Sequence, residues 1–349
     1  NGVTVNAPVL SSTRVRGNVT QQMPKKAFAV KLDKKHGVLD MPAHKRWVLL
    51  ANWKDRSLMR NHIALGVARI FSEQLGGAKE DALKTDGIPW NVRGQFVEVV
   101  YNGVHVGNYY LCEQIKIYKN RLNITKAYED ILENNTNPTM ADCGYLLEVD
   151  NNYDEDWQFK TDNGVPFMFK DAVNNDIKSA VQTKVQRIED NIDNGNFSAA
   201  YNELDLNTVI DQWFIWELTM NREYGDPRSV YYFMDGDGKL SAGPVWDFDR
   251  GTFQYYDGAK SLGNSERLKE YDEWICWRTG ESDNYFWYKK LITDPIFQQR
   301  VKDRWTVIYP YLQNVVNTIE GYRKPLRDSF AEDSRMWPTT KADIQAHKS

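Results

Sequence analysis

The feature that most constrains the fold of this chain is a helix–loop–hairpin pattern at residues 206–251. Residues 206–220 form an apolar run with helical character and lead into a polar loop. Two expected strands, residues 229–234 and 239–246, flank Asp-Gly steps at residues 235–238, and this combination predicts a tight hairpin turn. Because a hairpin brings its two open ends together, we expect the polar loop to lie close to the segment after the second strand.

Carboxylates stand at both open ends of this expected hairpin. The loop carries Glu223 and Asp226, and the second strand leads into Asp247 and Asp249, with Phe248 between them. Carboxylate oxygens are the ligands that hard divalent cations prefer. A loop carboxylate, a hairpin and then a metal-binding Asp before a Phe is also the order of groups in kinase phosphoryl-transfer sites. The alternative is that Asp247 and Asp249 only cap the end of a strand.

Composition is that of an ordinary globular protein, with 349 residues, of which 41% are hydrophobic and 26% charged. A formal net charge of −4 gives no general attraction to nucleic acid or to an anionic membrane. No apolar run approaches the roughly 20 residues of a membrane span. The three cysteines, Cys112, Cys143 and Cys276, are widely separated and form no zinc-binding pattern, and one disulfide remains an alternative.

Local patterns predict that the first third of the chain is rich in strands. Alternating residues at 10–35 indicate two strands, and the second of them carries Lys31. The Asn-Gly pair at residues 102–103 predicts a two-residue hairpin turn. The expected elements are strands over residues 27–32, 47–52, 96–101 and 104–117, and a helix over residues 58–75 with Asp55 or Ser57 as its cap.

Helices dominate the expected structure of the remaining chain. A strand is expected at residues 144–150 and a hairpin at residues 157–169. The expected helices cover residues 177–193, 206–220, 287–291, 295–312 and 315–330, with Phe297, Val301, Trp305 and Ile308 as a buried stripe. The order of elements predicts an α+β fold with a strand-rich lobe over residues 1–115 and a mainly helical lobe over residues 116–349.

In combination, the motifs of this chain resemble those of the CotH kinase family, the spore-coat protein H type of atypical protein kinase. The resemblance runs from about residue 16 to about residue 305. It rests on a Trp-Asp-Phe-Asp motif at residues 246–249, Arg-Gly-Asn at residues 16–18, Pro-Lys-Lys at residues 24–26, Lys-x-Trp-x-Leu-Leu-Ala-Asn at residues 45–52 and the hairpin at residues 102–114. It implies an atypical kinase-like fold with two lobes.

The resemblance also implies a phosphotransferase that uses ATP and Mg²⁺ or Mn²⁺ to phosphorylate Ser or Thr of a protein. Under this interpretation Asp247 and Asp249 bind the metal, Lys31 neutralises phosphate and Glu223 is the catalytic-loop carboxylate. The sequence departs from the family at this loop, where Asn-Arg-Glu at residues 221–223 replaces Asn-x-Asp. A metal-binding Asn about five residues later in kinases has no counterpart, because Arg228 and Ser229 stand there.

The nucleotide contacts implied by the resemblance come mostly from the first lobe. Arg16, Gly17 and Lys31 belong to its phosphate side, and Lys25 or Lys26 is an alternative to Lys31. Arg60 stands early in the helix that takes the place of a kinase αC helix. Glu113 and Gln114 form a hinge that contacts adenine, and the alternative for Glu113 is a structural role. The polar segment at residues 252–263 takes the place of a kinase activation segment and is expected to contact substrate.

Two other functions fit the same residues. One is a catalytically weak or inactive surface protein on the CotH fold that binds a protein or glycan partner through its aromatic surface. The other is a carbohydrate hydrolase with Glu148 and Asp247 as its two carboxylates. Family resemblance places the protein outside the cytoplasm, secreted or at a bacterial cell surface. The Asp residues at 235 and 237 lack the further ligands of a calcium loop, so a hairpin turn explains them better.

Overall fold

The computed structural model describes residues 11–74, 87–221, 223–225, 227–249, 252–253, 274–277, 287–313 and 315–338. Within these ranges the fold is α+β, as the sequence predicted, and it contains two antiparallel five-stranded sheets and eight α-helices. The chain forms two compact units. Residues 1–63, 92–114 and 316–349 belong to the first, and residues 64–91 and 115–315 belong to the second. The lobe boundary expected after residue 115 stays a prediction.

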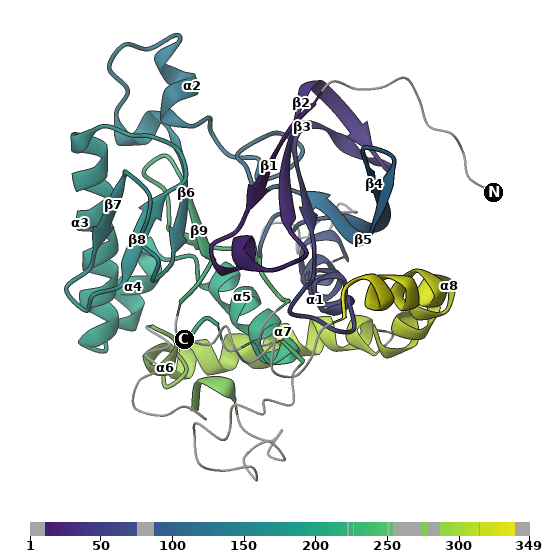
Figure 1. The fold of residues 1–349 in the computed structure, drawn as a ribbon. Helices are drawn as coiled ribbons and strands as arrows, with labels where there is room; N and C mark the ends of the chain where they lie inside the picture. The colour runs from purple at the N-terminus through teal and green to yellow at the C-terminus, as the bar shows by residue number, and fades with distance from the viewer. Residues whose placement is uncertain are drawn as a thin grey trace. The chain divides into compact units, whose positions relative to one another are not determined.

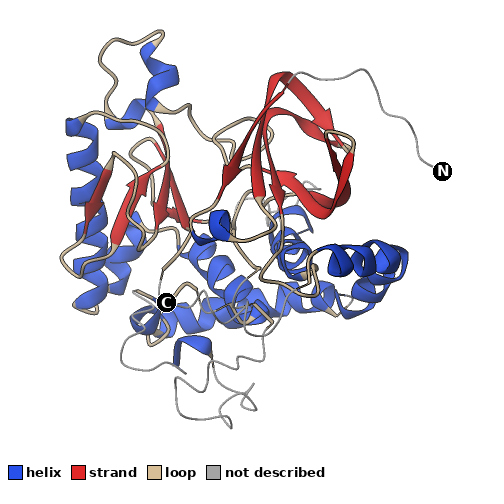
Figure 2. Ribbon diagram, in the orientation of Figure 1, coloured by secondary structure: helices blue, strands red, loops and turns tan. Residues whose placement is uncertain are grey.

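The first unit is built on a twisted antiparallel sheet (Figure 1; red strands in Figure 2). Its strands lie in the order β1 (Ser11–Arg16), β2 (Ala27–Val38), β3 (Met41–Leu50), β5 (Val104–Glu113) and β4 (Gly94–Tyr101). The predicted hairpin between β4 and β5 is confirmed, and its turn residues Asn102 and Gly103 have φ values of 50° and 79°. Both positive φ values are what a two-residue hairpin turn requires.

Helix α8 (Val315–Met336) contributes the last part of the first unit through a buried polar contact with the sheet. The Lys25 ammonium is 1% exposed and lies 2.6 Å from the Asp333 carboxylate. It also donates to the Asn108 carbonyl at 2.5 Å, and the Asn108 N–H donates to Asp333 at 2.8 Å. Gly107 is required here, because a β-carbon would lie 2.4 Å from the Asp333 Oδ1 atom. Lys25 is therefore an internal partner of α8.

The second unit contains the other sheet and most of the helices (Figure 1). Its strands lie in the order β10 (Ser241–Ala242), β9 (Val230–Asp235), β6 (Gly144–Val149), β8 (Pro166–Phe169) and β7 (Gln158–Lys160). Helix α3 (Asn175–Asp193) lies against β7, with Val181, Val185 and Ile188 buried. The remaining helices of the unit are α2 (Tyr128–Leu132), α4 (Phe197–Glu203), α5 (Leu206–Thr219), α6 (Tyr288–Leu291) and α7 (Pro295–Leu312).

Several expected elements differ from the observed ones at their ends. The strand expected at residues 239–246 is reduced to β10, because Gly243 and Pro244 follow and a proline has no N–H for the ladder. The expected strand at residues 104–117 ends at Glu113. Helix α1 (Arg60–Arg69) starts two residues late and continues as a π-helix over Ile70–Gln74. Trp305, expected in the core, is 38% exposed and stacks on Phe214.

Helix α5 is the most deeply buried helix of the second unit and carries a fully buried carboxylate. Asp211 is 0% exposed and forms a two-point ion pair with Arg304 of α7, both distances being 2.7 Å. The Ile88 N–H donates a third hydrogen bond to Asp211 at 3.1 Å. A β-carbon at Gly87 would lie 2.0 Å from the same carboxylate, so the backbone passes close to it. This contact fixes α5 against α7.

We expect the substitution Arg304→Met to destabilise the protein by about 3–5 kcal/mol, because it leaves the buried Asp211 without its charged partner. The change is measured by urea unfolding followed by tryptophan fluorescence. Arg300→Met is the matched control, since Arg300 lies on the same helix and is exposed. Adding Asp211→Asn to Arg304→Met should recover part of the loss. Equal effects of the Arg300 and Arg304 substitutions would contradict this prediction.

Candidate functional site

The polar loop that carries Glu223 lies between α5 and β9. It begins at the C-terminus of α5, where the chain reverses sharply. Met220 adopts a left-handed conformation with φ 52°. Its N–H donates to the Glu217 carbonyl at 3.1 Å, and the Asn221 N–H donates to the Trp216 carbonyl at 2.9 Å. This pair of bonds is a Schellman motif, which usually has Gly at the left-handed position. A methionine there carries backbone strain of a kind that clusters at functional sites.

The side chain of Asn221 connects the loop to the acidic motif that follows the hairpin. Its Oδ1 atom accepts a hydrogen bond from the Glu223 N–H at 2.8 Å. Its Nδ2 atom donates to the carbonyl of Asp247 at 3.4 Å. The open ends of the hairpin therefore lie together, as the sequence predicted. Asp226, the other expected loop carboxylate, lies outside the described residues.

The segment that carries Asp247 is held by contacts with three parts of the second unit. The Gly243 N–H donates to the Tyr231 carbonyl at 2.8 Å. The Val245 N–H donates at 3.1 Å to Asn91 Oδ1, whose amide in turn donates to the carbonyl of Ala68. In the motif itself Trp246 and Phe248 are buried, whereas Asp247 and Asp249 are partly exposed. The buried apolar residues thus anchor the segment, and both aspartates lie beside them at partly exposed positions.

The end of β6 holds the other side of the loop. The Asp150 carboxylate accepts hydrogen bonds from the N–H groups of Ser229 at 2.9 Å and Asn152 at 2.7 Å. The Asn151 N–H donates to the carbonyl of Pro227 at 2.9 Å. Burial raises the pKa of Asp150 above its ordinary value, and the hydrogen bonds from the two N–H groups oppose this rise. Ser229 is a further non-glycine residue with positive φ, at 52°.

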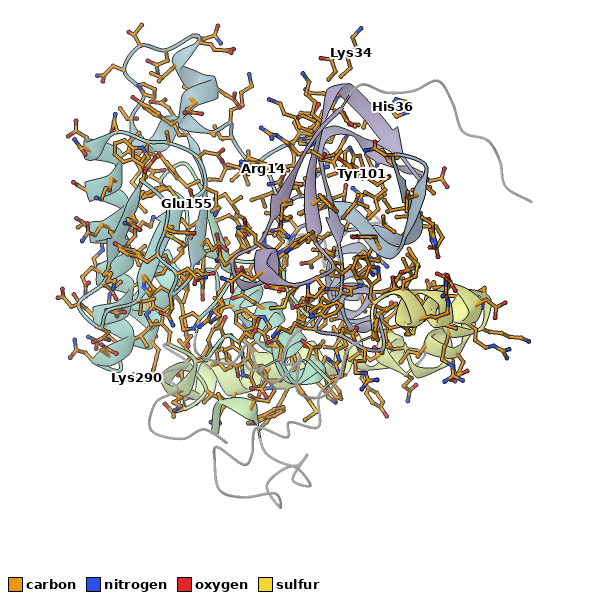
Figure 3. All side chains as sticks on the ribbon, viewed as in Figure 1. Arg14, Lys34, His36, Tyr101, Glu155 and Lys290 are labelled. Atoms are coloured by element: carbon orange, nitrogen blue, oxygen red, sulfur yellow. The ribbon has the colours of Figure 1, made fainter. Side chains whose placement is uncertain are left out.

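An ion-pair cluster lies beside this strand end. Lys170 follows β8 and bonds to Glu148 at 2.5 Å and to Glu155, which Figure 3 labels on the connection between β6 and β7. Burial alone would lower the pKa of Lys170, but the charges of Glu148 and Glu155 raise it above its ordinary value. Glu148 is thus an ion-pair partner of Lys170, which weakens the case for it as the free acid of a hydrolase.

The predicted phosphate residues of the first unit share one face of its sheet. Lys31 on β2 lies opposite Ser12 on β1 and opposite Arg46 on β3. Arg14 and Arg16 follow Ser12 at alternate positions of β1, so they project from the same face. Arg14 is labelled in Figure 3. Arg14 and Lys31 are exposed, and Arg16 and Arg46 are partly exposed. The face is therefore basic.

Gly17 and Arg60 both occupy positions where the backbone conformation is tightly defined. Gly17 has φ 101°, and a β-carbon there would lie 1.8 Å from Thr20 Oγ1, so no other residue fits the turn without a shift. Arg60 begins α1, where its N–H donates to Asp55 Oδ2 at 2.7 Å. The Ser57 N–H and hydroxyl donate to the same carboxylate. Both residues expected as the cap thus bond at the start of the helix, since Ser57 Oγ also accepts a hydrogen bond from the Met59 N–H at 3.3 Å.

Glu113 at the end of β5 is fully buried and carries a defined structural contact. Its carboxylate accepts two hydrogen bonds from the Arg93 guanidinium, at 3.0 and 3.1 Å, and a third from the Arg93 N–H. Gln114 follows it and is partly exposed. The structural role for Glu113 is therefore present, while adenine contacts by Glu113 and Gln114 stay predictions.

Two further observations concern metal and membrane. Among the described residues, no group of three or more His, Cys, Asp or Glu side chains converges as a metal-binding cluster. None of the helices that the structure describes is both long and apolar enough to cross a membrane. The segment at residues 254–263, most of the stretch expected to contact substrate, lies outside the described residues.

Sequence reasoning assigned no role to several residues that hold this site. Asn91, Asp150, Lys170 and Glu217 each contact the loop or its neighbours, and none belongs to a recognisable motif. Asp150 and Lys170 had one usable signal, because each is a charged residue at the end of an apolar strand. Asn91 had none, since its partners at residues 68 and 245 are distant in the sequence.

Comparison with known proteins gives one positive result. A family model described as "CotH kinase protein" matches residues 13–349 of this chain. A search of curated proteins found no significant match. The family match covers essentially the whole chain and includes both compact units.

The Lys170 cluster predicts a defined stability change with pH. Lys170→Met should cost about 1–3 kcal/mol at pH 7, because it leaves Glu148 buried without its donor. The Lys170 pKa is raised above 10.5 in the folded state. The ion pair therefore stabilises fully below about pH 10.5, and the difference between wild type and variant shrinks as pH rises further. Urea unfolding at several pH values measures this difference in the free energy of unfolding. Lys119→Met is the control, because Lys119 is exposed. A difference that grows at high pH would contradict the prediction.

Proposed function

The chain belongs to the CotH kinase protein family, and on that premise we propose that it is an ATP- and divalent-metal-dependent kinase for Ser or Thr of a protein. The observation that carries this proposal is the Asn221 side chain, which bonds both to the Glu223 N–H and to the Asp247 carbonyl. One amide thus joins the backbone of Glu223 to the backbone of Asp247. Phosphoryl transfer depends mainly on such positioning. A kinase-like arrangement of two lobes is part of the same proposal.

Glu223 orients the acceptor hydroxyl in this proposal. The hydroxyl oxygen forms the new bond to the γ-phosphorus, the bond from that phosphorus to the β–γ bridging oxygen breaks, and the hydroxyl proton passes to the Glu223 carboxylate. Lys31 and Arg16 neutralise phosphate charge, and the neighbouring Arg14 and Arg46 make their sheet face an electrostatically suitable anion surface. Gly17, Arg60, Glu113 and Gln114 remain the other proposed nucleotide contacts.

Asp247 and Asp249 suit a metal of the Mg²⁺ type. Such ions are usually held by one or two carboxylates together with substrate phosphates, so a protein cluster of three or more ligands is not required. Both side chains are partly exposed beside the buried Trp246 and Phe248. A bound Mg²⁺ or Mn²⁺ would supply charge neutralisation at the phosphate oxygens.

A second candidate is a non-catalytic surface protein on the same fold, which binds a protein or glycan partner. It is favoured by the longer Glu223 in place of the family's Asp. It is also favoured by exposed aromatic rings on α7, where Trp305 is 38%, Tyr309 47% and Tyr311 42% exposed. Aromatic rings of this kind suit either partner. A location outside the cytoplasm is a further proposal, which the family resemblance alone supports.

Metal binding is tested by thermal unfolding with Mn²⁺, with ATP and with both. At a hundred times its dissociation constant the ligand should stabilise the fold by about 2.7 kcal/mol. Asp247→Ala should abolish the metal-dependent shift, because it removes a ligand and relieves repulsion with Asp249. Asp237→Ala, an exposed aspartate of the hairpin turn, is the control and should keep the shift. A shift that survives in Asp247→Ala places the metal elsewhere.

Catalysis is tested by transfer of radiolabelled phosphate from ATP to a generic protein acceptor in the presence of Mn²⁺. We expect slow transfer by the wild type, because a displacement of one methylene can cost on the order of a hundredfold. Glu223→Asp should raise the rate and Glu223→Gln should remove it. Rapid transfer that is indifferent to both substitutions rejects Glu223 as the catalytic carboxylate. Absence of ATP binding in every variant favours the binding-protein function.

A further inference from the structure

Glu217 is a carboxylate at an electrostatically unfavourable position. It lies in the last turn of α5, where the partial negative charge of the helix C-terminus opposes an acidic side chain. It is also only 9% exposed, so water does little to offset that repulsion. A buried carboxylate at the C-terminus of a helix needs compensating contacts. Residues in such locally unfavourable positions are often found at functional sites.

The compensating contacts join two separate segments. The Tyr224 hydroxyl donates to Glu217 Oε1 at 2.5 Å. The N–H of Ile275 donates to Oε2 at 2.5 Å, and the N–H of Cys276 donates to Oε1 at 3.3 Å. Both oxygens are therefore engaged, one with the loop after α5 and both with the short 3-10 helix Ile275–Trp277, which follows the Trp-Asp-Phe-Asp motif in the chain.

Tyr224 connects Glu217 to the loop that carries Glu223. Its ring is 1% exposed and stacks on Trp216 with centroids 4.6 Å apart and an interplanar angle of 9°. It meets the ring of Tyr288 edge-on at 5.6 Å. Glu223 precedes Tyr224 directly, and its own N–H is held by Asn221. Glu223 is thus held at its own N–H and through the side chain of the residue that follows it.

We propose that Glu217 is a positioning residue, which holds the Glu223 loop through the Tyr224 hydroxyl and ties it to residues 275 and 276. The inference rests on the proposed function for its effect on phosphotransfer. Its effect on the loop itself does not depend on that function. Nothing in the family motif identifies Glu217, because its partners are assembled only by the fold.

The kinetic test uses Tyr224→Phe, which keeps the stacked ring and removes only the hydroxyl, and Glu217→Gln. Both should lower kcat by about ten- to a hundredfold, because the loop carboxylate moves, with little change in KM for ATP. Tyr288→Phe is the matched control, since Tyr288 is buried in the same cluster and its hydroxyl bonds to Gln212 instead. Wild-type kcat in the two test variants, or an equal fall in Tyr288→Phe, overturns the inference.

A second measurement does not depend on activity. Cys276 is fully buried, and burial, followed by the nearby Glu217 charge, raises its pKa to about 12, so a thiol reagent should modify it slowly. Loss of the hydrogen bond to Glu217 should speed its modification about tenfold or more in Tyr224→Phe, which leaves the Glu217 charge in place, whereas Glu217→Gln also removes that charge and serves only in the kinetic test. Cys112 and Cys143 are also buried cysteines, and serve as internal controls.

The kinetic and thiol-labelling measurements test the proposed kinase function and the positioning role of Glu217 separately. Wild-type protein that binds no ATP and transfers no phosphate overturns the proposed function, and the Cys276 result then decides alone whether Glu217 holds the loop. Faster labelling of Cys276 only, mapped by mass spectrometry, supports the anchoring role. Unchanged labelling of Cys276, or equal acceleration at all three cysteines, overturns it.

Discussion

The burial of helix α5 is the constraint on which the rest of the second unit depends. A buried polar group costs free energy unless it is hydrogen-bonded, and a buried charge costs more unless it is paired. Three polar side chains of α5 each reach different segments. Asp211 pairs with Arg304, Gln212 bonds to the Tyr231 carbonyl and the Tyr288 hydroxyl, and Glu217 bonds to Tyr224 and the 3-10 helix. The helix thus fixes β9, α6, α7 and the candidate loop at once.

The regular elements were largely predictable because their signals are local. Helix α7 has the predicted bounds, and the hairpin of β4 and β5 follows from Asn102 and Gly103. The bounds of α5 differ from the prediction by one residue, because Met220 leaves the helical conformation to form the C-terminal reversal. In each case the sequence pattern and the tertiary environment favour the same conformation.

The contacts between segments that are distant in the sequence were much less predictable. The Lys25–Asp333 pair is 308 residues apart in the sequence, and its two residues look like ordinary surface charges until α8 is placed. The short β10 was overestimated because the apolar pattern continues past Gly243, while the missing N–H of Pro244 ends the ladder. The prediction that the loop meets Asp247 is confirmed, since hairpin geometry alone requires it. Asn221 matches the Asn of the family's Asn-x-Asp loop, but that match does not show that its side chain joins the loop to Asp247.

Local strain gives the last argument about the site. Met220, Ser229 and Asp247 have φ values of 52°, 52° and 66°, and each left-handed non-glycine residue costs of order 1–3 kcal/mol unless its surroundings compensate. All three belong to the loop and the motif that Asn221 connects. The surrounding bonds are specific: a Schellman reversal at Met220, the Asp150 carboxylate at Ser229 and the Asn221 amide at Asp247. A fold selected for stability alone would place glycine at these positions. The presence of Met, Ser and Asp at these positions is best explained by a need to hold Asp247 and the Glu223 loop in one defined geometry.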